Sequence, residues 1–364
     1  MSKFKYVALD NSKDHEITGV PLATAKLKRA FVWGLLILGQ PAWGLRAENG
    51  SATDLFTQVV ERQRSNESAI ASVLIKGAYK AVEYGRTGQV TYVWQYDFFS
   101  FSRSNDLMRV LRRGHEEVMP HDAKDSRDFV QFKVDEIQFY SPKSTVEVDL
   151  GGPIAQRRRA ERPQPYPLSF GYGLIYRDDI DGIESLASAW EGVSREGLLT
   201  VRHAPDDPRL LLAEVRRGQM RVRCWIDPDR GNIIVRRKAD QLVPGSRDKW
   251  LVLEEYEIAP KQFGSSWFFE KAWGKRYLRY YEPEGSAIPR GTYLREEQTL
   301  AVSNFVAGAT FKPEEFEFST NSFPHLMVLQ DTMRDKTIDL TTGQVIPTNA
   351  HTWVLHPERL PPKP

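Results

Sequence analysis

Residues 221–305 read as one antiparallel hairpin after another, and this series limits the fold more than any other feature of the chain. In the clearest case the apolar run 224–226 passes through the turn 227–231, Asp-Pro-Asp-Arg-Gly, into a second apolar run, 233–235. Two apolar runs joined by a short turn predict a pair of antiparallel strands. A calcium-binding loop needs more oxygen ligands than the two aspartates of this turn supply, so an ordinary turn is predicted there.

Alternation of apolar residues extends the pattern toward the N-terminus. Odd positions are apolar in 71–81 and even positions in 90–98, after which the apolar phase shifts to Phe99 and Phe101. The run 130–139 changes phase in the same way, at Asp135-Glu136. A phase change within a strand predicts a β-bulge, which bends the strand. The sequence therefore predicts a mainly β (α+β) fold with a few helices: a strongly curved antiparallel sheet or incomplete barrel closed by helices.

The remaining segments are expected to be helices, loops and a tail. Helical spacing of apolar residues predicts helices over 51–64 and 178–193. Four prolines predict a loop over 151–167, so we expect a loop and helix insertion near 151–195. Residues 332–364 form a predicted C-terminal extension, with a short hairpin around 341–344.

The predicted loop contains three consecutive arginines, Arg157, Arg158 and Arg159. A solvated loop accounts for them, and contact with anionic headgroups at a membrane surface is the alternative.

Residues 1–47 read as a secretory signal peptide with a long n-region. A basic cluster at 26–29 precedes the apolar run 31–38, and the small residues Ala42, Gly44 and Ala47 follow. Cleavage is predicted after Gly44 or after Ala47, and a retained signal anchor is the alternative. The protein is therefore expected to be periplasmic or otherwise exported.

Composition and spacing exclude several classes of function. A formal net charge of +2 without a clustered basic face predicts no nucleic-acid partner. The single cysteine, Cys224, excludes an internal disulfide and is predicted to be a small buried apolar residue. His115 and His121 lie six residues apart with Pro120 between them, which does not match a metal-binding helix. No catalytic residues, metal ligands or cofactors are predicted.

The order of these segments resembles the outer-membrane lipoprotein carrier and lipoprotein-sorting superfamily. The resemblance covers residues 54–331 and is carried by the hairpin at 224–233, the strands at 250–273 and the closing segment 311–331. His325 stands in the closing segment where that family usually has a glycine. The resemblance implies that residues 48–331 form one lipoprotein-carrier-like β domain, an incomplete barrel whose concave face holds acyl chains.

Aromatic side chains on alternating strand positions are the candidate lining of such a cavity, although the same alternation is also typical of an ordinary core. The predicted ligand-binding residues are Tyr92, Trp94, Tyr96, Trp250, Trp267, Phe269 and Trp273. We therefore expect an exported, non-catalytic protein that holds a lipid or lipoprotein acyl chain in an apolar cavity.

Two alternatives remain open at this point. One is an interaction or structural protein of the cell envelope whose barrel is filled by its own side chains. The other is a hydrolase of envelope polymers, in which a cleft gathers acids such as Glu254, Glu270 and Glu297.

Overall fold

The structure is a computed structural model that describes residues 50–119, 129–160, 164–177, 182–280 and 290–346. The predicted signal peptide and the last residues of the predicted extension lie outside these ranges. Two helices are described, α1 (Gly50–Ala69) and α2 (Leu186–Arg195). Neither of them, nor any other helix in the described ranges, combines the length and apolar character needed to cross a bilayer.

Strands make up most of the described chain. The N-terminal group is β1 (Ser72–Tyr84), β2 (Val90–Ser104), β3 (Leu107–Val118), β4 (Val130–Tyr140), β5 (Ser144–Asp149) and β6 (Ile154–Arg159). The short pair β7 (Ile175–Arg177) and β8 (Gly182–Glu184) follows. The next group is β9 (Leu199–His203), β10 (Leu211–Arg217), β11 (Met220–Asp227), β12 (Ile233–Leu242), β13 (Trp250–Phe263), β14 (Ser266–Tyr280) and β15 (Gly291–Ala307). The last three are β16 (Val328–Asp331), β17 (Lys336–Asp339) and β18 (Val345–Ile346).

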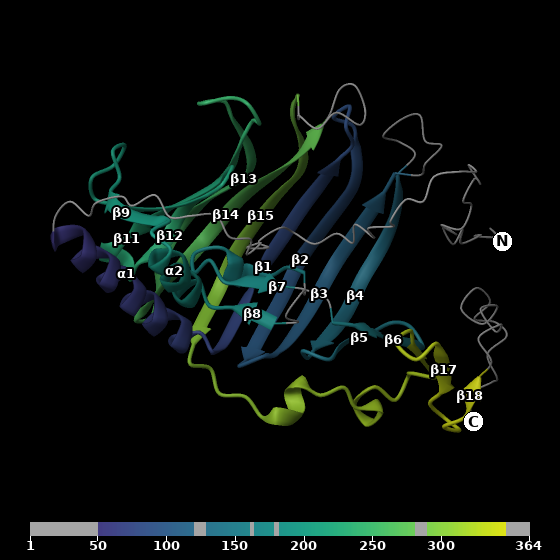
Figure 1. The fold of residues 1–364 in the computed structure, drawn as a ribbon. Helices are drawn as coiled ribbons and strands as arrows, with labels where there is room; N and C mark the ends of the chain where they lie inside the picture. The colour runs from purple at the N-terminus through teal and green to yellow at the C-terminus, as the bar shows by residue number, and fades with distance from the viewer. Residues whose placement is uncertain (1–49, 120–128, 161–163, 178–181, 281–289, 347–364) are drawn as a thin grey trace.

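Sixteen of these strands form one open sheet in the order β18-β17-β16-β6-β5-β4-β3-β2-β1-β15-β14-β13-β12-β11-β10-β9 (Figure 1). Two antiparallel meanders, β1–β6 and β9–β15, meet where β1 pairs with β15. The C-terminal strands join the other end, where β16 runs parallel to β6. The fold is mainly β, as predicted, and in the described part of the chain the sheet is not closed into a barrel.

Local turn chemistry explains why the predicted hairpins form. The pattern at 224–235 is the β11–β12 hairpin, and Gly231 in its turn has a φ of 70°, a conformation that favours glycine. The Asp227 side chain accepts a hydrogen bond from the Asp229 amide and so closes the turn. The predicted bulge in β2 is also confirmed, because the pairing with β3 shifts between Tyr96 and Phe98.

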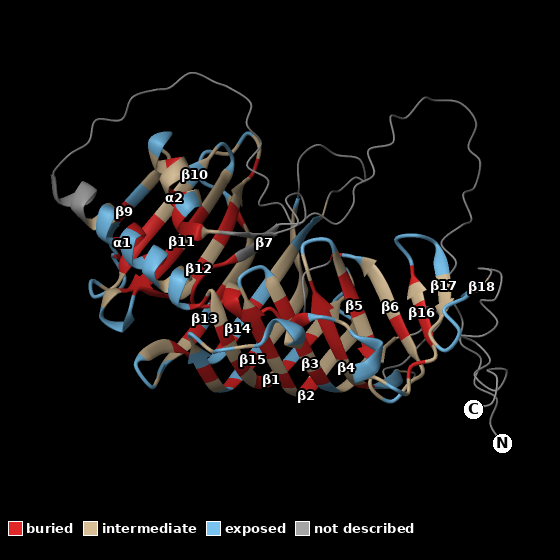
Figure 2. Ribbon diagram, turned by 90° about the horizontal axis from the view of Figure 1, so that it is seen from below, coloured by how far each residue is buried: buried red, intermediate tan, exposed pale blue. Residues whose placement is uncertain are grey.

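One face of the sheet, here called the inner face, carries both helices and the segment 164–174, here called the inner strap (Figure 1). The opposite face is called the outer face. The main core lies between the inner face, the inner strap and the apolar sides of α1 and α2. Bands of buried residues run across neighbouring strands in Figure 2, as expected when alternate residues of each strand face the same core.

A second, smaller core lies on the outer face at the β4–β6 end of the sheet. Ile137 and Phe139 of β4 are buried there, and the phenyl rings of Phe318 and Phe323 pack on Phe139 with centroids 6.3 and 5.9 Å away. These two rings belong to the connection between β15 and β16, which runs along the lower ends of the strands in Figure 1.

This second core corrects the predicted bulge at Asp135-Glu136. Pairing of β3 with β4 continues without a register shift through these residues. The apolar phase changes because Val134 faces the inner core and Ile137 faces the outer one.

Two further predictions are corrected by the structure. The predicted loop over 151–167 contains strand β6, because Val146 and Val148 of β5 pair with Arg157 and Ala155. The predicted helix over 178–193 is shorter: α2 begins at Leu186, where the Ser185 hydroxyl accepts a hydrogen bond from the Ser188 amide. Residues 182–184, included in that prediction, form β8 instead, and residues 178–181 lie outside the described ranges.

Candidate ligand pocket on the inner face

The inner strap covers the apolar part of the inner face with side chains at every second position. Five of them are buried: Tyr166, Leu168, Phe170, Tyr172 and Leu174. The Phe170 ring meets the rings of Tyr256 and Phe269 at centroid distances of 5.2 and 6.0 Å. Tyr172 stacks on Phe268 at 5.5 Å. The face that was expected to hold an acyl chain is therefore occupied by the protein's own side chains.

Few main-chain contacts tie the inner strap to the sheet. In the described part of the chain one isolated bridge joins its backbone to a strand, where the Ile234 amide donates to the Gly171 carbonyl at 2.6 Å. The Tyr172 hydroxyl donates to the Trp267 carbonyl at 2.6 Å, and the Gln63 amide of α1 donates to the Tyr172 carbonyl at 2.8 Å. Burial of apolar side chains is therefore the main attachment of the inner strap.

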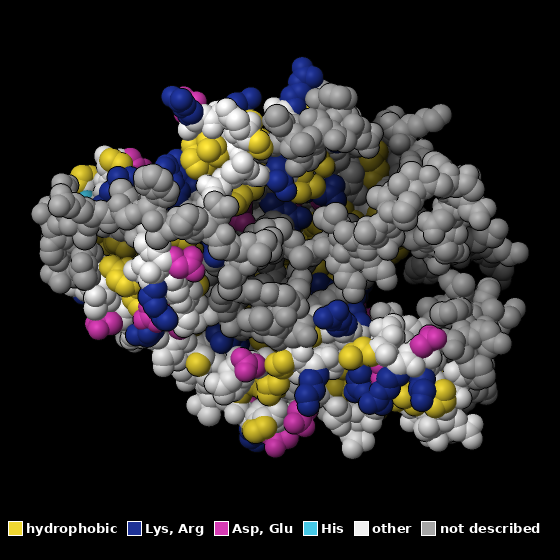
Figure 3. All heavy atoms as spheres, in the orientation of Figure 1, with side chains coloured by type: hydrophobic (Ala, Val, Ile, Leu, Met, Phe, Trp, Pro, Cys, Tyr) yellow, Lys and Arg dark blue, Asp and Glu magenta, His cyan; other side chains and the backbone are white. Residues whose placement is uncertain are grey.

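A pocket of about 330 Å³ lies on the inner face where the inner strap begins. Side chains of β2 to β6 and Gln164 of the strap line it: Trp94, Arg112, Glu116, Gln138, Thr145, Glu147, Arg158 and Gln164. Figure 3 shows this face of the molecule, with Lys and Arg side chains next to hydrophobic ones. The lining is mostly polar, so the pocket differs in chemistry from the apolar cavity that the sequence predicted.

Glu116 lies at the aromatic side of this pocket. It is the direct cross-strand partner of Trp94, and its carboxylate accepts hydrogen bonds from the hydroxyls of Tyr92 and, at 2.7 Å, Tyr96. Burial, together with the negative charge of Glu116, raises the pKa of both tyrosines. Both phenols are therefore neutral donors, and they hold the carboxylate in one position beside the Trp94 ring.

Arg112 connects the two sides of the pocket. Its guanidinium forms an ion pair with Glu136, lies 3.5 Å from the Glu147 carboxylate and donates to the Tyr96 hydroxyl at 3.1 Å. Arg112 also donates to the main-chain carbonyl of Gln164 at 3.5 Å. The inner strap therefore enters the core directly beside the polar pocket.

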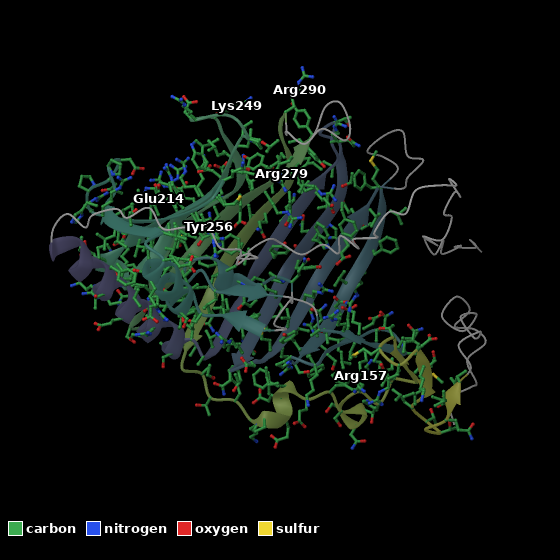
Figure 4. All side chains as sticks on the ribbon, viewed as in Figure 1. Arg157, Glu214, Lys249, Tyr256, Arg279 and Arg290 are labelled. Atoms are coloured by element: carbon green, nitrogen blue, oxygen red, sulfur yellow. The ribbon has the colours of Figure 1, made fainter. Side chains whose placement is uncertain are left out.

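Arg158 closes the far side of the pocket. Its guanidinium pairs with Glu147, which also accepts a hydrogen bond from Gln138 at 2.6 Å. Its neighbour Arg157, labelled in Figure 4, lies 3.7 Å from the buried Asp331 at the junction of β6 and β16. Arg157 and Arg158 are thus part of the sheet's ion-pair network.

The aromatic residues predicted to bind a ligand fall into separate places. Tyr92, Trp94 and Tyr96 lie together around Glu116, and Trp94 is the one of the three that lines the pocket. Phe269 is fully buried under the inner strap, and the main chain of Trp267 accepts the Tyr172 hydrogen bond.

Trp250 and Trp273 lie on the outer face, away from the pocket. The Trp250 ring stacks under the Arg221 guanidinium at 4.1 Å, and Trp273 is 46% exposed. Arg221 alternates along β11 with the core residue Val222, and Trp273 follows the buried Ala272 in β14. The alternation places both tryptophans on the face opposite the core.

Reasoning from the sequence missed Glu116, Arg112 and Arg158 as pocket residues. The sequence feature that could have identified Glu116 is the register of the β2–β3 hairpin, whose strands are joined by the two-residue turn Asn105-Asp106. Counting back from this turn places Trp94 opposite Glu117, and the bulge near Asp97 moves the partner to Glu116. The bulge therefore decides which of two adjacent acids enters the pocket.

The acids considered for a hydrolase are not gathered in one cleft. Glu254 lies 3.6 Å from Arg237, Glu270 lies 3.5 Å from Lys261, and Glu297 lies 3.1 Å from Lys275. Each of the three is part of a separate ion pair. In the described ranges no group of three or more His, Cys, Asp and Glu side chains is arranged to hold a metal ion.

Comparison with known proteins finds similarity only among solved structures. No known protein family and no curated protein matches the sequence. The similar structures include a DUF1329 family protein from Desulfovibrio piger, with 10% identity, a TM-score of 0.36 and coverage of 74% of this chain and 98% of that chain. A putative outer membrane lipoprotein-sorting protein domain from Vibrio parahaemolyticus has 7% identity, a TM-score of 0.34 and coverage of 74% and 99%.

A structure described as showing lipid-protein interactions in lipovitellin is also similar, with 8% identity, a TM-score of 0.26 and coverage of 66% of this chain and 26% of that chain. A lipoprotein-sorting protein domain is therefore among the structures to which this chain is similar, as the sequence resemblance led us to expect. At these identities and TM-scores, the likeness carries no argument about what this chain binds.

Proposed function

We propose that this protein is an exported, non-catalytic binding protein that holds a lipid or lipoprotein acyl chain against its inner face. The observation that carries the proposal is the inner strap. It covers an extensive apolar surface of the sheet with five buried side chains, but in the described part of the chain a single bridge joins its main chain to the main chain of a strand. An incoming acyl chain takes the place of these side chains.

The free energy gained by burying the five side chains of the inner strap is comparable to that gained by burying an acyl chain. Burying a large apolar side chain stabilises by about 1.5–3 kcal/mol, so five of them contribute on the order of 10 kcal/mol. Moving an acyl chain of about sixteen carbons out of water contributes about 13 kcal/mol at roughly 0.8 kcal/mol per methylene. Neither occupant greatly outweighs the other, which is the balance that reversible loading requires.

Export and the shape of the binding site belong to the same proposal. The predicted signal peptide takes the chain out of the cytoplasm, and a membrane surface is where an acyl chain is collected or delivered. In this proposal the sheet is strongly curved, α1 and α2 close one end of it, and the polar pocket lies where the chain enters. No nucleic acid and no cofactor take part.

The same packing also favours a second function, an envelope interaction or structural protein whose interior is permanently filled. The two functions differ in whether the inner strap leaves the inner face. A test must therefore change the attachment of the strap without creating a cavity under it.

Tyr172→Phe makes that change, because it removes only the hydroxyl that donates to the Trp267 carbonyl. One hydrogen bond contributes about 1 kcal/mol, so competition between strap and ligand predicts about five-fold tighter binding of a fluorescent fatty acid. Tyr277→Phe is the matched control, since its hydroxyl donates to Glu255 at 2.9 Å, away from the strap.

Mass spectrometry of the organic extract of the exported, folded protein complements this titration. A stoichiometric lipid, or tighter binding by Tyr172→Phe alone, supports the carrier. A clean extract together with a fatty acid that binds none of the three proteins shows instead that the interior is permanently filled.

A further inference from the structure

Formal charges in and beside the polar pocket do not balance. Two guanidinium groups and three carboxylates are found there: Arg112, Arg158, Glu116, Glu136 and Glu147. Each arginine pairs with a carboxylate other than Glu116. Within the described ranges Glu116 lies in no ion pair and accepts hydrogen bonds from two neutral tyrosine hydroxyls. The pocket therefore has one negative charge in excess, located at Glu116.

Aromatic rings lie next to this charge. Trp94 stands directly across from Glu116 on the neighbouring strand, where side chains are roughly 5 Å apart. The Tyr92 ring lies against Trp94 with a centroid distance of 4.2 Å. A carboxylate next to aromatic rings is a combination that attracts an organic cation, by ion pairing with the carboxylate and by cation–π contact with an accessible ring.

We infer that the polar pocket binds an alkylammonium group, held between the Glu116 carboxylate and the Trp94 ring. An anion is disfavoured, because it would add to the excess negative charge and the two guanidinium groups already have acidic partners. The volume of about 330 Å³ accommodates a small polar group and lies at the lower end of ordinary ligand pockets.

The position of the pocket indicates how a larger ligand would lie. Gln164, which lines the pocket, is followed after Pro165 by the buried part of the inner strap. A ligand that replaced the strap would place its polar end where the Gln164 carbonyl now accepts from Arg112. An amine-bearing lipid headgroup is therefore one source of the ammonium group, and this source rests on the proposed function. A free soluble amine is the other.

The experiment compares ligands that share or lack the ammonium group. Calorimetry measures binding of lysophosphatidylethanolamine and lysophosphatidylglycerol, both below their micellar concentrations, and of free ethanolamine and glycerophosphoethanolamine. The variant is Glu116→Gln, which keeps an acceptor for the tyrosine hydroxyls and removes the charge. Glu117→Gln is the matched control: Glu117 is the next residue of β3, outside the pocket lining, and its carboxylate lies 3.5 Å from His115.

The expected result is a preference of about ten-fold for the ethanolamine lipid, present in the wild type and Glu117→Gln and absent in Glu116→Gln. Free ethanolamine or glycerophosphoethanolamine that binds only when Glu116 is present supports the pocket even if neither lipid binds, and in that case the proposed acyl carrier fails. Equal binding of both lipids by the wild type overturns the ammonium site and leaves the acyl carrier standing. Absence of all binding overturns both.

Discussion

The Tyr172 hydroxyl donates a hydrogen bond to the main-chain carbonyl of Trp267 at 2.6 Å, which ties the inner strap to β14. The Tyr172 ring stacks on Phe268, and burial raises the pKa of its phenol. One residue therefore supplies both a polar and an apolar attachment of the segment that covers the inner face.

Replacing Phe170 by Ala tests how much the inner strap contributes to folding. The ring is buried between Tyr256 and Phe269, so its removal leaves a cavity, and a loss of about 3–5 kcal/mol in the free energy of unfolding is expected. Tyr172→Phe, which keeps its ring, is expected to cost about 1 kcal/mol. Urea denaturation of both variants measures the difference. A cost below about 1 kcal/mol for Phe170→Ala would show that the strap is not part of the folded core.

The ion pair of Arg237 and Glu254 joins the neighbouring strands β12 and β13, and the Arg237 side chain is 5% exposed. Glu254→Gln takes away the opposite charge and is expected to destabilise by about 3–5 kcal/mol, because the guanidinium stays buried. The exposed pair of Lys261 and Glu270 is the control, and Glu270→Gln is expected to change stability by less than about 0.5 kcal/mol. Similar small effects of both substitutions would contradict the prediction.

Alkaline pH is expected to destabilise the protein. Burial and the hydrogen bond to Glu255 raise the pKa of Tyr277 from 10.0 to about 12. Burial also raises the pKa of the phenols of Tyr92, Tyr96 and Tyr256. Between the unfolded and the folded pKa the native state keeps a proton that the unfolded state has released. The stabilisation is therefore complete below pH 10 and is lost as pH rises through about 12.

The urea midpoint, measured in steps from pH 9 upward, checks this prediction. Tyr277→Phe removes one of the titrating groups and is expected to flatten the decline. A midpoint that stays constant through this range would count against the buried, neutral phenols.

The thiol of Cys224 is expected to be unreactive in the folded protein. It is buried, and desolvation raises its pKa from 9.0 to about 11, so the thiolate is scarce at neutral pH. A thiol reagent that gives a coloured product measures the rate. Modification is expected only after urea unfolds the chain, whereas fast modification of the native protein would show that this part of the core opens.

Much of the architecture could be predicted because its causes are local. The turn at 227–231 and the alternation in 90–101 indicated the β11–β12 hairpin and the bulged β2, and α1 followed from helical spacing. The second phase change, at Asp135-Glu136, was misread because a bulge and a change of the buried face leave the same pattern. The unshifted pairing of β3 with β4 and the contact of Phe139 with Phe318 and Phe323 tell the two apart.

The candidate site was predictable only in part. Three of its aromatic residues, Tyr92, Trp94 and Tyr96, stood out because they alternate along one strand. Their partner Glu116, on β3, did not stand out, because the one-residue bulge at Asp97 of β2 decides whether Glu116 or Glu117 faces them.

Strand alternation and turn chemistry depend on residues close together in the chain, so the long antiparallel meander follows from the amino-acid order. What covers each face of the sheet follows only from the folded chain. The inner strap lies on one face and residues 318–329 contribute to the core on the other, and both are far in sequence from strands that they contact. Whether the inner face is an empty cavity or a covered surface depends on these long-range contacts, which leave no periodic signal in the strands themselves.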